Sequence, residues 1–405
     1  MIRRHSGWKL AFILAISLFI SGCWDRNELN ELGVISATGI DWKDGKWVAT
    51  TQMVLPLSTM GEGTGKQLSI APVDVFMMEG EGIRNTFRKA SLETTRKLYF
   101  SHNQVVIIGE DAARQGIDPL LDVYLRNMDA REDVIMFLTR GSASDILRQI
   151  SPTEWNPGNG LRKLIEMEDE QTSRMRAMNI FAVISELLGP TQSTSIPEIR
   201  VSGNPETLSS VEALKKSKLD ARLKLGRLGI VKRNKLVGWV KLDESFGMMW
   251  LGNHMEQGYV PFDCEDGEGS RSASFRVIQA HTKATPYLVQ GQLRMKVTAR
   301  VKGVIDDFTC RDDLAKLDVV KRQEKHVEEE ITMLMEKGWK ALKNLKTDSV
   351  GFGTRVYERY PKLWAKIKDD WDEQFVKLSP EFRVSVHIDG TGSSNPSISS
   401  YQRKQ

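Results

Sequence analysis

The first 23 residues constrain the fold most, because they set where the folded chain begins and on which side of a membrane it folds. Basic residues come first, then the uncharged apolar stretch 10–20, then small residues ending at Cys23. A basic start, a short apolar core and small residues before a cleavage point are the parts of a secretory signal. A cysteine at that point predicts a lipoprotein signal, cleaved between Gly22 and Cys23, with S-diacylglycerol and N-acyl (palmitate) modification of Cys23.

Two alternatives compete with this interpretation. An uncleaved membrane helix is disfavoured, because the eleven residues 10–20 reach only about 17 Å, against a hydrocarbon core of roughly 30 Å. A plain secretory signal cut elsewhere, with Cys23 merely buried, stays open because small residues at 21 and 22 fit both cuts. Two acyl chains hold a protein stably at a membrane. We therefore expect a lipid-anchored protein on the extracytoplasmic side of a membrane.

Composition indicates a chain with real hydrophobic cores. Hydrophobic residues make up 40% of the chain, which includes ten tryptophans, so a disordered tether is excluded. The formal charge of +4 falls to +1 when Arg3, Arg4 and Lys9 leave with the signal. No basic tract is interleaved with aromatic residues, so we expect no nucleic-acid partner. The length of the mature chain suggests two or three domains.

The first half reads as short strands alternating with helices. Strands at 34–41 and 47–55 flank Asp44-Gly45, a strong hairpin turn signal. The apolar runs 105–108 and 134–139 predict strands buried on both faces. Helices are expected at 82–97, 111–114, 119–128, 142–150, 161–178 and 180–188, and the helix after Ser142 takes Asp145 as its capping partner. The Gly- and Pro-rich segment 189–204 predicts the main domain boundary.

The second half changes from sheet to helix. Residues 223–232 and 235–242 predict a hairpin at the start of the C-terminal domain, and 274–283 and 292–305 are longer alternating strands. Apolar residues then fall at helical spacing over 312–345, a second helix follows Pro361, and 381–389 returns as a strand. The predicted fold is multi-domain α+β: a mixed α/β region, then an antiparallel sheet with two long helices. The boundaries are a signal at 1–22, an N-terminal region of one or two subdomains at 23–200, a linker at 201–220, a C-terminal domain at 221–390 and a disordered tail at 391–405.

Few residues predict chemistry. The Gly-rich segment 60–66 lacks the pattern of a phosphate-binding loop, no two of the six histidines are spaced as metal ligands, and no Gly-x-Ser-x-Gly motif occurs. We expect no catalytic residue, metal or cofactor. His102 is the histidine to weigh, although a turn-capping role is more common there. Five tryptophans are candidates for a ligand groove: Trp239, Trp250, Trp339, Trp364 and Trp371. Of these, Trp371 lies on the apolar stripe of a predicted helix, which favours a core position. A disulfide between Cys264 and Cys310 is allowed outside the cytoplasm, but we favour two free thiols.

Several segments together resemble one family. The lipobox runs into Trp24-Asp25 and then into Leu32-Gly33-Val34-Ile35-Ser36-Ala37-Thr38-Gly39-Ile40-Asp41. Leu98 to His102 leads into Val105 to Glu110, Leu125-Arg126-Asn127 precedes Val134, and Thr347 to Gly353 follows the long helix. This order and spacing are similar to those of the Ger(x)C lipoproteins, the C subunits of nutrient germinant receptors in endospore-forming bacteria. Asn127 stands where that family is expected to have Asp.

The resemblance implies a non-enzymatic subunit, anchored by lipid to the outer face of the spore inner membrane. It also implies two membrane-embedded partner subunits and a role in germination in response to nutrients, while direct binding of the nutrient stays open. Only Cys23 carries over as a residue with assigned chemistry. The alternative function is a lipid-anchored solute-binding protein of a transporter, which the antiparallel second half disfavours. A lipid-anchored envelope hydrolase would need a nucleophile or a metal cluster.

Overall fold

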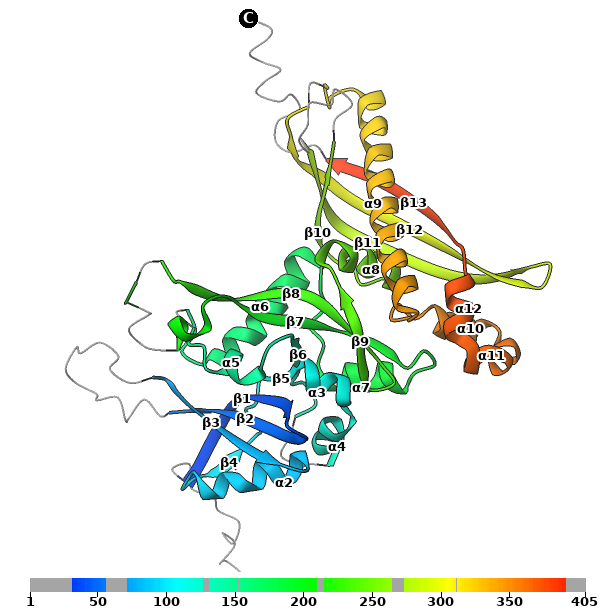
Figure 1. The fold of residues 1–405 in the computed structure, drawn as a ribbon. Coiled ribbons are helices and arrows are strands. Elements are labelled where there is room, and N and C mark those ends of the chain that lie inside the picture. Colours follow the sequence, from blue (N-terminus) through cyan, green and yellow to red (C-terminus); the bar gives the residue numbers. More distant parts are fainter. Residues whose placement is uncertain are drawn as a thin grey trace, which may run out of the picture.

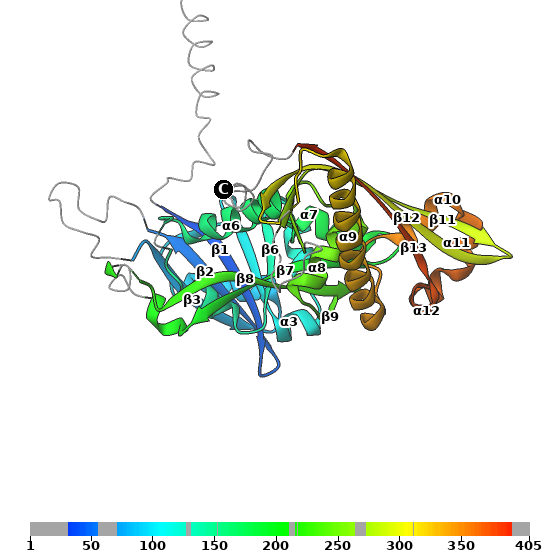
Figure 2. The ribbon, with the colours of Figure 1, turned by 90° about the horizontal axis from the view of Figure 1, so that it is seen from above.

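The computed structural model describes residues 31–55, 71–126, 131–151, 153–209, 215–216, 218–263, 273–310 and 312–390. Two β-sheets lie at opposite ends of the molecule, with helices around and between them (Figures 1 and 2). The mixed α+β fold with several structural units is therefore confirmed. The predicted signal 1–22, the segment 60–66 and the tail 391–405 lie outside the described residues.

The first sheet has nine strands in the order β3-β2-β1-β5-β6-β7-β8-β9, with β4 beside the start of β1. Its strands are β1 Leu32–Lys43, β2 Lys46–Val54, β3 Val73–Gly80, β4 Lys97–Tyr99, β5 Val105–Gly109, β6 Ile135–Thr139, β7 Ser193–Gly203, β8 Ala221–Lys232 and β9 Lys235–Val240. The predicted hairpin is confirmed: Lys43 pairs with Lys46 around Asp44 and Gly45, both at positive φ. The two outer parts of this sheet are antiparallel and its centre is parallel.

The parallel centre explains the two fully apolar runs. All residues of β5 and β6 are buried, and alternate side chains enter different cores. Val105 and Ile107 join one core, which includes α5 (Ala143–Leu147) and α6 (Pro157–Thr172). Val106 and Ile108 join the other, which includes α3 (Glu110–Gln115), α4 (Asp118–Arg126) and α7 (Ile180–Leu188). Helices thus cover both faces, as continuous hydrophobic strands require.

Three helices of the first half are shorter than predicted: the expected helix 142–150 is α5 Ala143–Leu147, and the other two show why. The expected helix 82–97 is α2 Ile83–Arg88 followed by a 3₁₀ turn at Lys89–Leu92, because residues 97–99 pair with β1 instead. The expected helix 161–178 ends at Thr172, where Ser173 adopts a left-handed conformation. The apolar residues continue at helical spacing in both segments. The first helix ends because the chain pairs with β1, and the second ends because Ser173 is left-handed.

The hairpin at 223–242, expected at the start of the C-terminal domain, lies in the first sheet and not in the second. Its strands β8 and β9 extend the first sheet, because β8 pairs along its length with β7. The Gly- and Pro-rich segment that suggested a boundary contains β7 itself, and Pro197 sits at a register shift, where a missing N–H is tolerated. The predicted linker 201–220 thus connects two neighbouring strands of one sheet.

The second sheet has the order β10-β11-β12-β13, formed by Gly258–Phe262, Ala273–Val289, Gln292–Phe308 and Pro380–Gly390. The first three strands are antiparallel, as expected, but β13 runs parallel to β12. Parallel neighbours need a crossover, which is the helical segment between them: α9 Leu317–Leu345, α10 Phe352–Arg359, α11 Pro361–Ile367 and α12 Trp371–Lys377. The second long helix expected after Pro361 is therefore two short helices joined by a 3₁₀ turn.

Helix α8 (Leu242–Gly252) joins the two sheets and packs against α9. The two helices touch backbone to backbone at Gly247 and Gly338. A Cβ atom at Gly338 would lie 2.6 Å from the carbonyl carbon of Gly247, and one at Gly247 would lie 1.9 Å from the carbonyl oxygen of Leu334. Glycine is required at both positions because no side chain fits. One hydrophobic core runs through this contact from β1 to β13.

Cys310 is buried and disulfide-bonded. The preference for two free thiols is therefore wrong for this residue. Its partner lies outside the described residues, as Cys23 and Cys264 both do. A disulfide is chemically allowed in the compartment that the signal predicts.

Candidate functional site

Asp41, at the end of the first family motif, caps a helix that is remote in sequence. Its carboxylate accepts hydrogen bonds from the backbone N–H of Ala143 (2.9 Å) and Ser144 (3.3 Å) and from the hydroxyl of Ser142 (2.7 Å). These groups begin α5. Ser142 is the N-cap, as predicted, and its hydroxyl accepts from the backbone N–H of Ser144 at 3.2 Å. Asp41 adds further acceptors to this local cap. Burial raises the pKa of Asp41, and the hydrogen bonds partly oppose that shift. A Cβ at Gly109 would lie 2.1 Å from the carboxylate, which explains glycine there.

A buried polar cluster ties the same motif to the loop before β5. The side-chain amide of Asn103 donates to the Tyr124 hydroxyl at 2.7 Å and to the Thr38 hydroxyl at 3.1 Å. Burial raises the pKa of Tyr124 to about 12, so its hydroxyl stays neutral. The neighbouring His102 is exposed, and its carbonyl accepts from the side chain of Gln104. Asn103, which is buried, therefore holds this loop in place, and the exposed His102 beside it does not.

Asp348, in the motif after the long helix, organises the joint between the two sheets. Its carboxylate accepts from the backbone N–H of Phe352 (3.0 Å) and Gly353 (2.6 Å) and from Nε1 of Trp371 (3.0 Å). The side chain is buried, and desolvation raises its pKa despite these donors. The preceding Thr347 exchanges a hydrogen bond of 2.7 Å with Ser193 on β7. This motif thus connects α10, α12 and the first sheet.

The tryptophans form core rather than a groove. Trp250, Trp339, Trp364 and Trp371 are all at most 9% exposed, and Trp239 is partly buried against the core on the α3 side. Trp371 is held by Asp348 and packs on Trp364, with ring centroids 5.1 Å apart. Burial in the core decides between the two roles that the sequence offered for Trp371.

The predicted lipidation site, Cys23 with Gly22 before it, lies outside the described residues, and so does Asn127. Among the described residues, no group of three His, Cys, Asp or Glu side chains is placed to hold a metal ion. Within the same ranges, no helix combines the length and the apolar character that a bilayer crossing requires.

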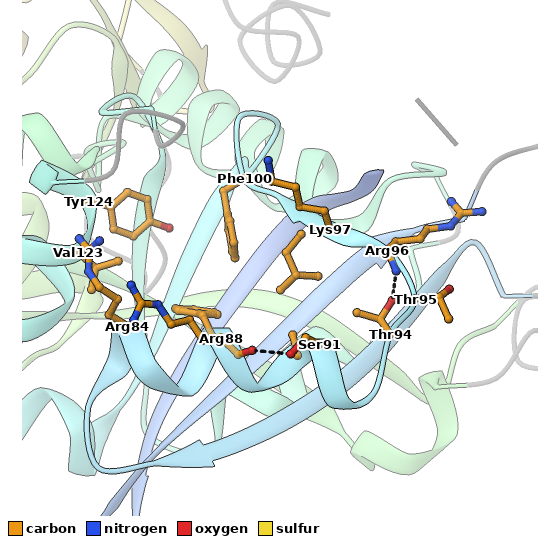
Figure 3. A pocket seen from close by; sticks show the side chains of 13 residues that line it. Arg84, Arg88, Ser91, Thr94, Thr95, Arg96, Lys97, Phe100, Val123 and Tyr124 are labelled. Carbon is orange, nitrogen blue, oxygen red and sulfur yellow. Dashed lines mark hydrogen bonds between the residues drawn. The ribbon is translucent and has the colours of Figure 1, made fainter. Parts of the chain in front are cut away.

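A cavity of about 530 Å³ opens between α2, the 3₁₀ turn after it, β4 and α4 (Figure 3). We call it the α2–β4 cavity. Its apolar wall includes Phe87, Leu98, Phe100 and Val123, and the rings of Phe87 and Phe100 meet edge to face at 5.2 Å. The Tyr124 ring also lines it, with the hydroxyl already engaged by Asn103. Leu98 and Phe100 belong to a segment of the family resemblance, but the sequence did not indicate a cavity, because its lining comes from three elements that only folding brings together.

The rim of this cavity is basic. Arg84, Arg88, Arg96 and Lys97 line it, and no aspartate or glutamate does. None of these four side chains forms an ion pair within the ranges that the structure describes. Figure 3 shows Arg84 and Arg88 side by side near Val123, one helical turn apart on α2. The site therefore joins an apolar wall to uncompensated positive charge.

The arrangement of the two sheets is similar to that in a known crystal structure. The chain aligns with the crystal structure of the GerBC protein with a TM-score of 0.54 and 20% identity, covering 87% of this chain and 96% of that chain. Residues 25–201 match the model for the spore germination protein N-terminal domain. Residues 227–392 match the model described as spore germination B3/GerAC like, C-terminal.

Similar proteins from Bacillus subtilis (strain 168) match over nearly their whole length. Spore germination protein KC is 30% identical over 96% of this chain and 97% of its own. Spore germination protein A3 is 24% identical over 94% and 96%, and spore germination protein B3 is 23% identical over the same shares. The chain belongs to the GerAC-like family of spore germination proteins, and the resemblance to the Ger(x)C proteins is confirmed.

Proposed function

We propose that this protein is a lipid-anchored C subunit of a spore germinant receptor, required for germination in response to nutrients. The observation that carries the proposal is the coincidence of both family domains with a lipobox ending at Cys23. The two acyl chains of the diacylglycerol on that residue would already hold the folded chain stably against the outer face of the spore inner membrane. Its partners are two membrane-embedded receptor subunits.

The subunit acts through interaction and signalling rather than catalysis. The described carboxylates whose pKa burial raises are Asp41, Asp169 and Asp348, and all three accept backbone N–H groups. Such acceptors stabilise helix ends and turns, which is a structural role. The second sheet, with its three antiparallel strands, also differs from the parallel lobes of solute-binding proteins and disfavours that alternative.

The anchor is tested by fractionating sporulating cells of the natural host. Cys23→Ala removes the acylated thiol and should move the protein from the membrane fraction to the soluble fraction. Ser21→Ala keeps a small residue before the cleavage point and should leave the protein in the membrane. Retention of the Cys23→Ala protein in membranes, or an unmodified Cys23 by mass spectrometry in the natural protein, would refute the anchor.

The receptor role is tested by germination of spores that lack the gene. They should fail to respond to one set of nutrients while still germinating with nutrient-independent triggers, and the intact gene should restore the response. Unchanged germination with every nutrient would argue against the role. The purified protein should not turn over cell-wall substrates, and steady hydrolysis by it would favour an envelope enzyme instead.

A further inference from the structure

We propose that the α2–β4 cavity binds an amphipathic anion, a single acidic head group carried on an apolar body. No function is assigned to this cavity by the family or by the predicted anchor. Its volume of about 530 Å³ falls within the roughly 300–1,000 Å³ typical of small-molecule sites, which combine apolar walls with a few convergent polar groups.

The wall fits an apolar body. Phe87, Leu98 and Phe100 are only partly buried by the protein, although they are large apolar side chains. The rings of Phe87 on α2 and Phe100 just after β4 pack edge to face at 75°, so they form an angled apolar wall. An aromatic or alkyl ligand would remove this surface from water, a gain that scales with the apolar area covered.

The charge of the rim selects the head group. Arg84 and Arg88 stand on one face of α2, where like charges four residues apart repel each other. An acidic group between them would replace that repulsion with charge-assisted, bidentate hydrogen bonds. A zwitterion such as an amino acid is disfavoured, because no lining carboxylate would meet its ammonium group. The rim therefore favours a simple anion over a neutral or zwitterionic ligand.

An amphipathic anion could come from two sources, a soluble carboxylate or an acidic lipid. β4 pairs with Leu32–Val34, so the cavity lies beside the point where the described chain enters the fold. The eight residues 24–31 span at most about 29 Å, so a lipid anchored at Cys23 keeps the cavity within reach of the membrane surface. Only the lipid source rests on the proposed function. The binding chemistry stands without it.

The test uses the full-length protein in phosphatidylcholine nanodiscs and isothermal titration calorimetry. The probes are 3-phenylpropionate, its neutral match 3-phenylpropanol, the zwitterion phenylalanine, and the short-chain lipids dihexanoyl phosphatidylglycerol and dihexanoyl phosphatidylcholine. The binding variant is Arg84→Gln/Arg88→Gln. The matched control is Arg222→Gln/Lys224→Gln, which removes the same charge from two exposed positions on β8. All four positions are exposed, so both variants should fold.

We expect 3-phenylpropionate or the anionic lipid to bind with Kd on the order of a millimolar or tighter. Binding should weaken at least about tenfold in the Arg84/Arg88 variant and stay unchanged in the control. Binding of the lipid alone identifies a head-group site, and binding of the carboxylate alone identifies a soluble ligand. Equal binding of 3-phenylpropanol or phenylalanine, equal loss in both variants, or no heat from any probe would overturn the proposal. An unmodified Cys23 would leave the carboxylate result standing and remove only the lipid source.

Discussion

The glycine contact between α8 and α9 should be among the least tolerant positions in the chain. In Gly338→Ala, the new methyl group would meet backbone atoms of Gly247 and Met248, both 2.6 Å away. Backbone atoms of a helix cannot rotate aside as a side chain can, so the two helices must separate. Residues 245–251 of α8 are all buried, so that separation would open the core that links the two sheets.

Two terms set the size of the effect. Overpacking a tight core costs about 1–3 kcal/mol, and contact with two backbone atoms places this site near the upper end. Replacing glycine by alanine inside a helix returns about 1 kcal/mol of helix propensity. We therefore expect Gly338→Ala to lower the free energy of unfolding by about 1–2 kcal/mol.

The assay is urea denaturation followed by tryptophan fluorescence, since Trp250 and Trp339 lie on these two helices. The control is Gly141→Ala, because a Cβ at Gly141 meets nothing within 4 Å and the residue has no positive φ. That variant should change the free energy of unfolding by no more than about 0.5 kcal/mol. Gly338→Ala at or above the stability of the control would refute the backbone-contact argument.

Three further predictions concern buried polar groups. Asp348→Ala leaves three buried donors without their acceptor, including Nε1 of Trp371, and should cost about 3 kcal/mol in urea denaturation; a loss under about 1 kcal/mol would contradict it. Asp41→Ala removes the acceptor of the Ala143 N–H at the start of α5 and should cost about 1–2 kcal/mol, with faster amide exchange at 143 than in the unaltered protein; unchanged exchange there would argue against this role of Asp41. Burial and the nearby Arg176 lower the pKa of His254 from 6.5 to about 3, so its contribution to stability is present above pH 6.5 and is lost as the pH falls toward 3. His254→Asn should therefore flatten the decline in urea midpoint between pH 6.5 and 4, and an equally steep decline would show that another group causes it.

Local sequence signals were enough for the elements with one strong pattern. The Asp44-Gly45 turn, the buried strands β5 and β6 and the long helix α9 all appear close to where the sequence placed them. In each of these elements, residues within a few positions of one another determine the local structure. A continuous apolar run needs cover on both faces wherever the strand sits.

Elements whose role depends on a remote partner were missed or misplaced. Nothing in 223–242 distinguishes an antiparallel hairpin in one sheet from the same hairpin in another, and only pairing with β7 decides it. Ser142 caps α5 locally, as the sequence predicts, but the additional acceptors from Asp41, about a hundred residues earlier, could not be predicted from the sequence. The α2–β4 cavity likewise takes its wall from three elements and its charge from side chains that look like an ordinary solvated surface in the sequence.

The sequence by itself indicated the family and the alternation of strands and helices, and it predicts an export signal, because each depends on contiguous residues or on their spacing. Tertiary structure alone decided the direction of β13, the sheet that β8 and β9 join, the glycine contact between α8 and α9, and the basic cavity. The physical reason is that hydrogen-bond partners, close approach and uncompensated charge depend on which segments meet in space. Periodicity within one segment reports which face is buried, not what buries it.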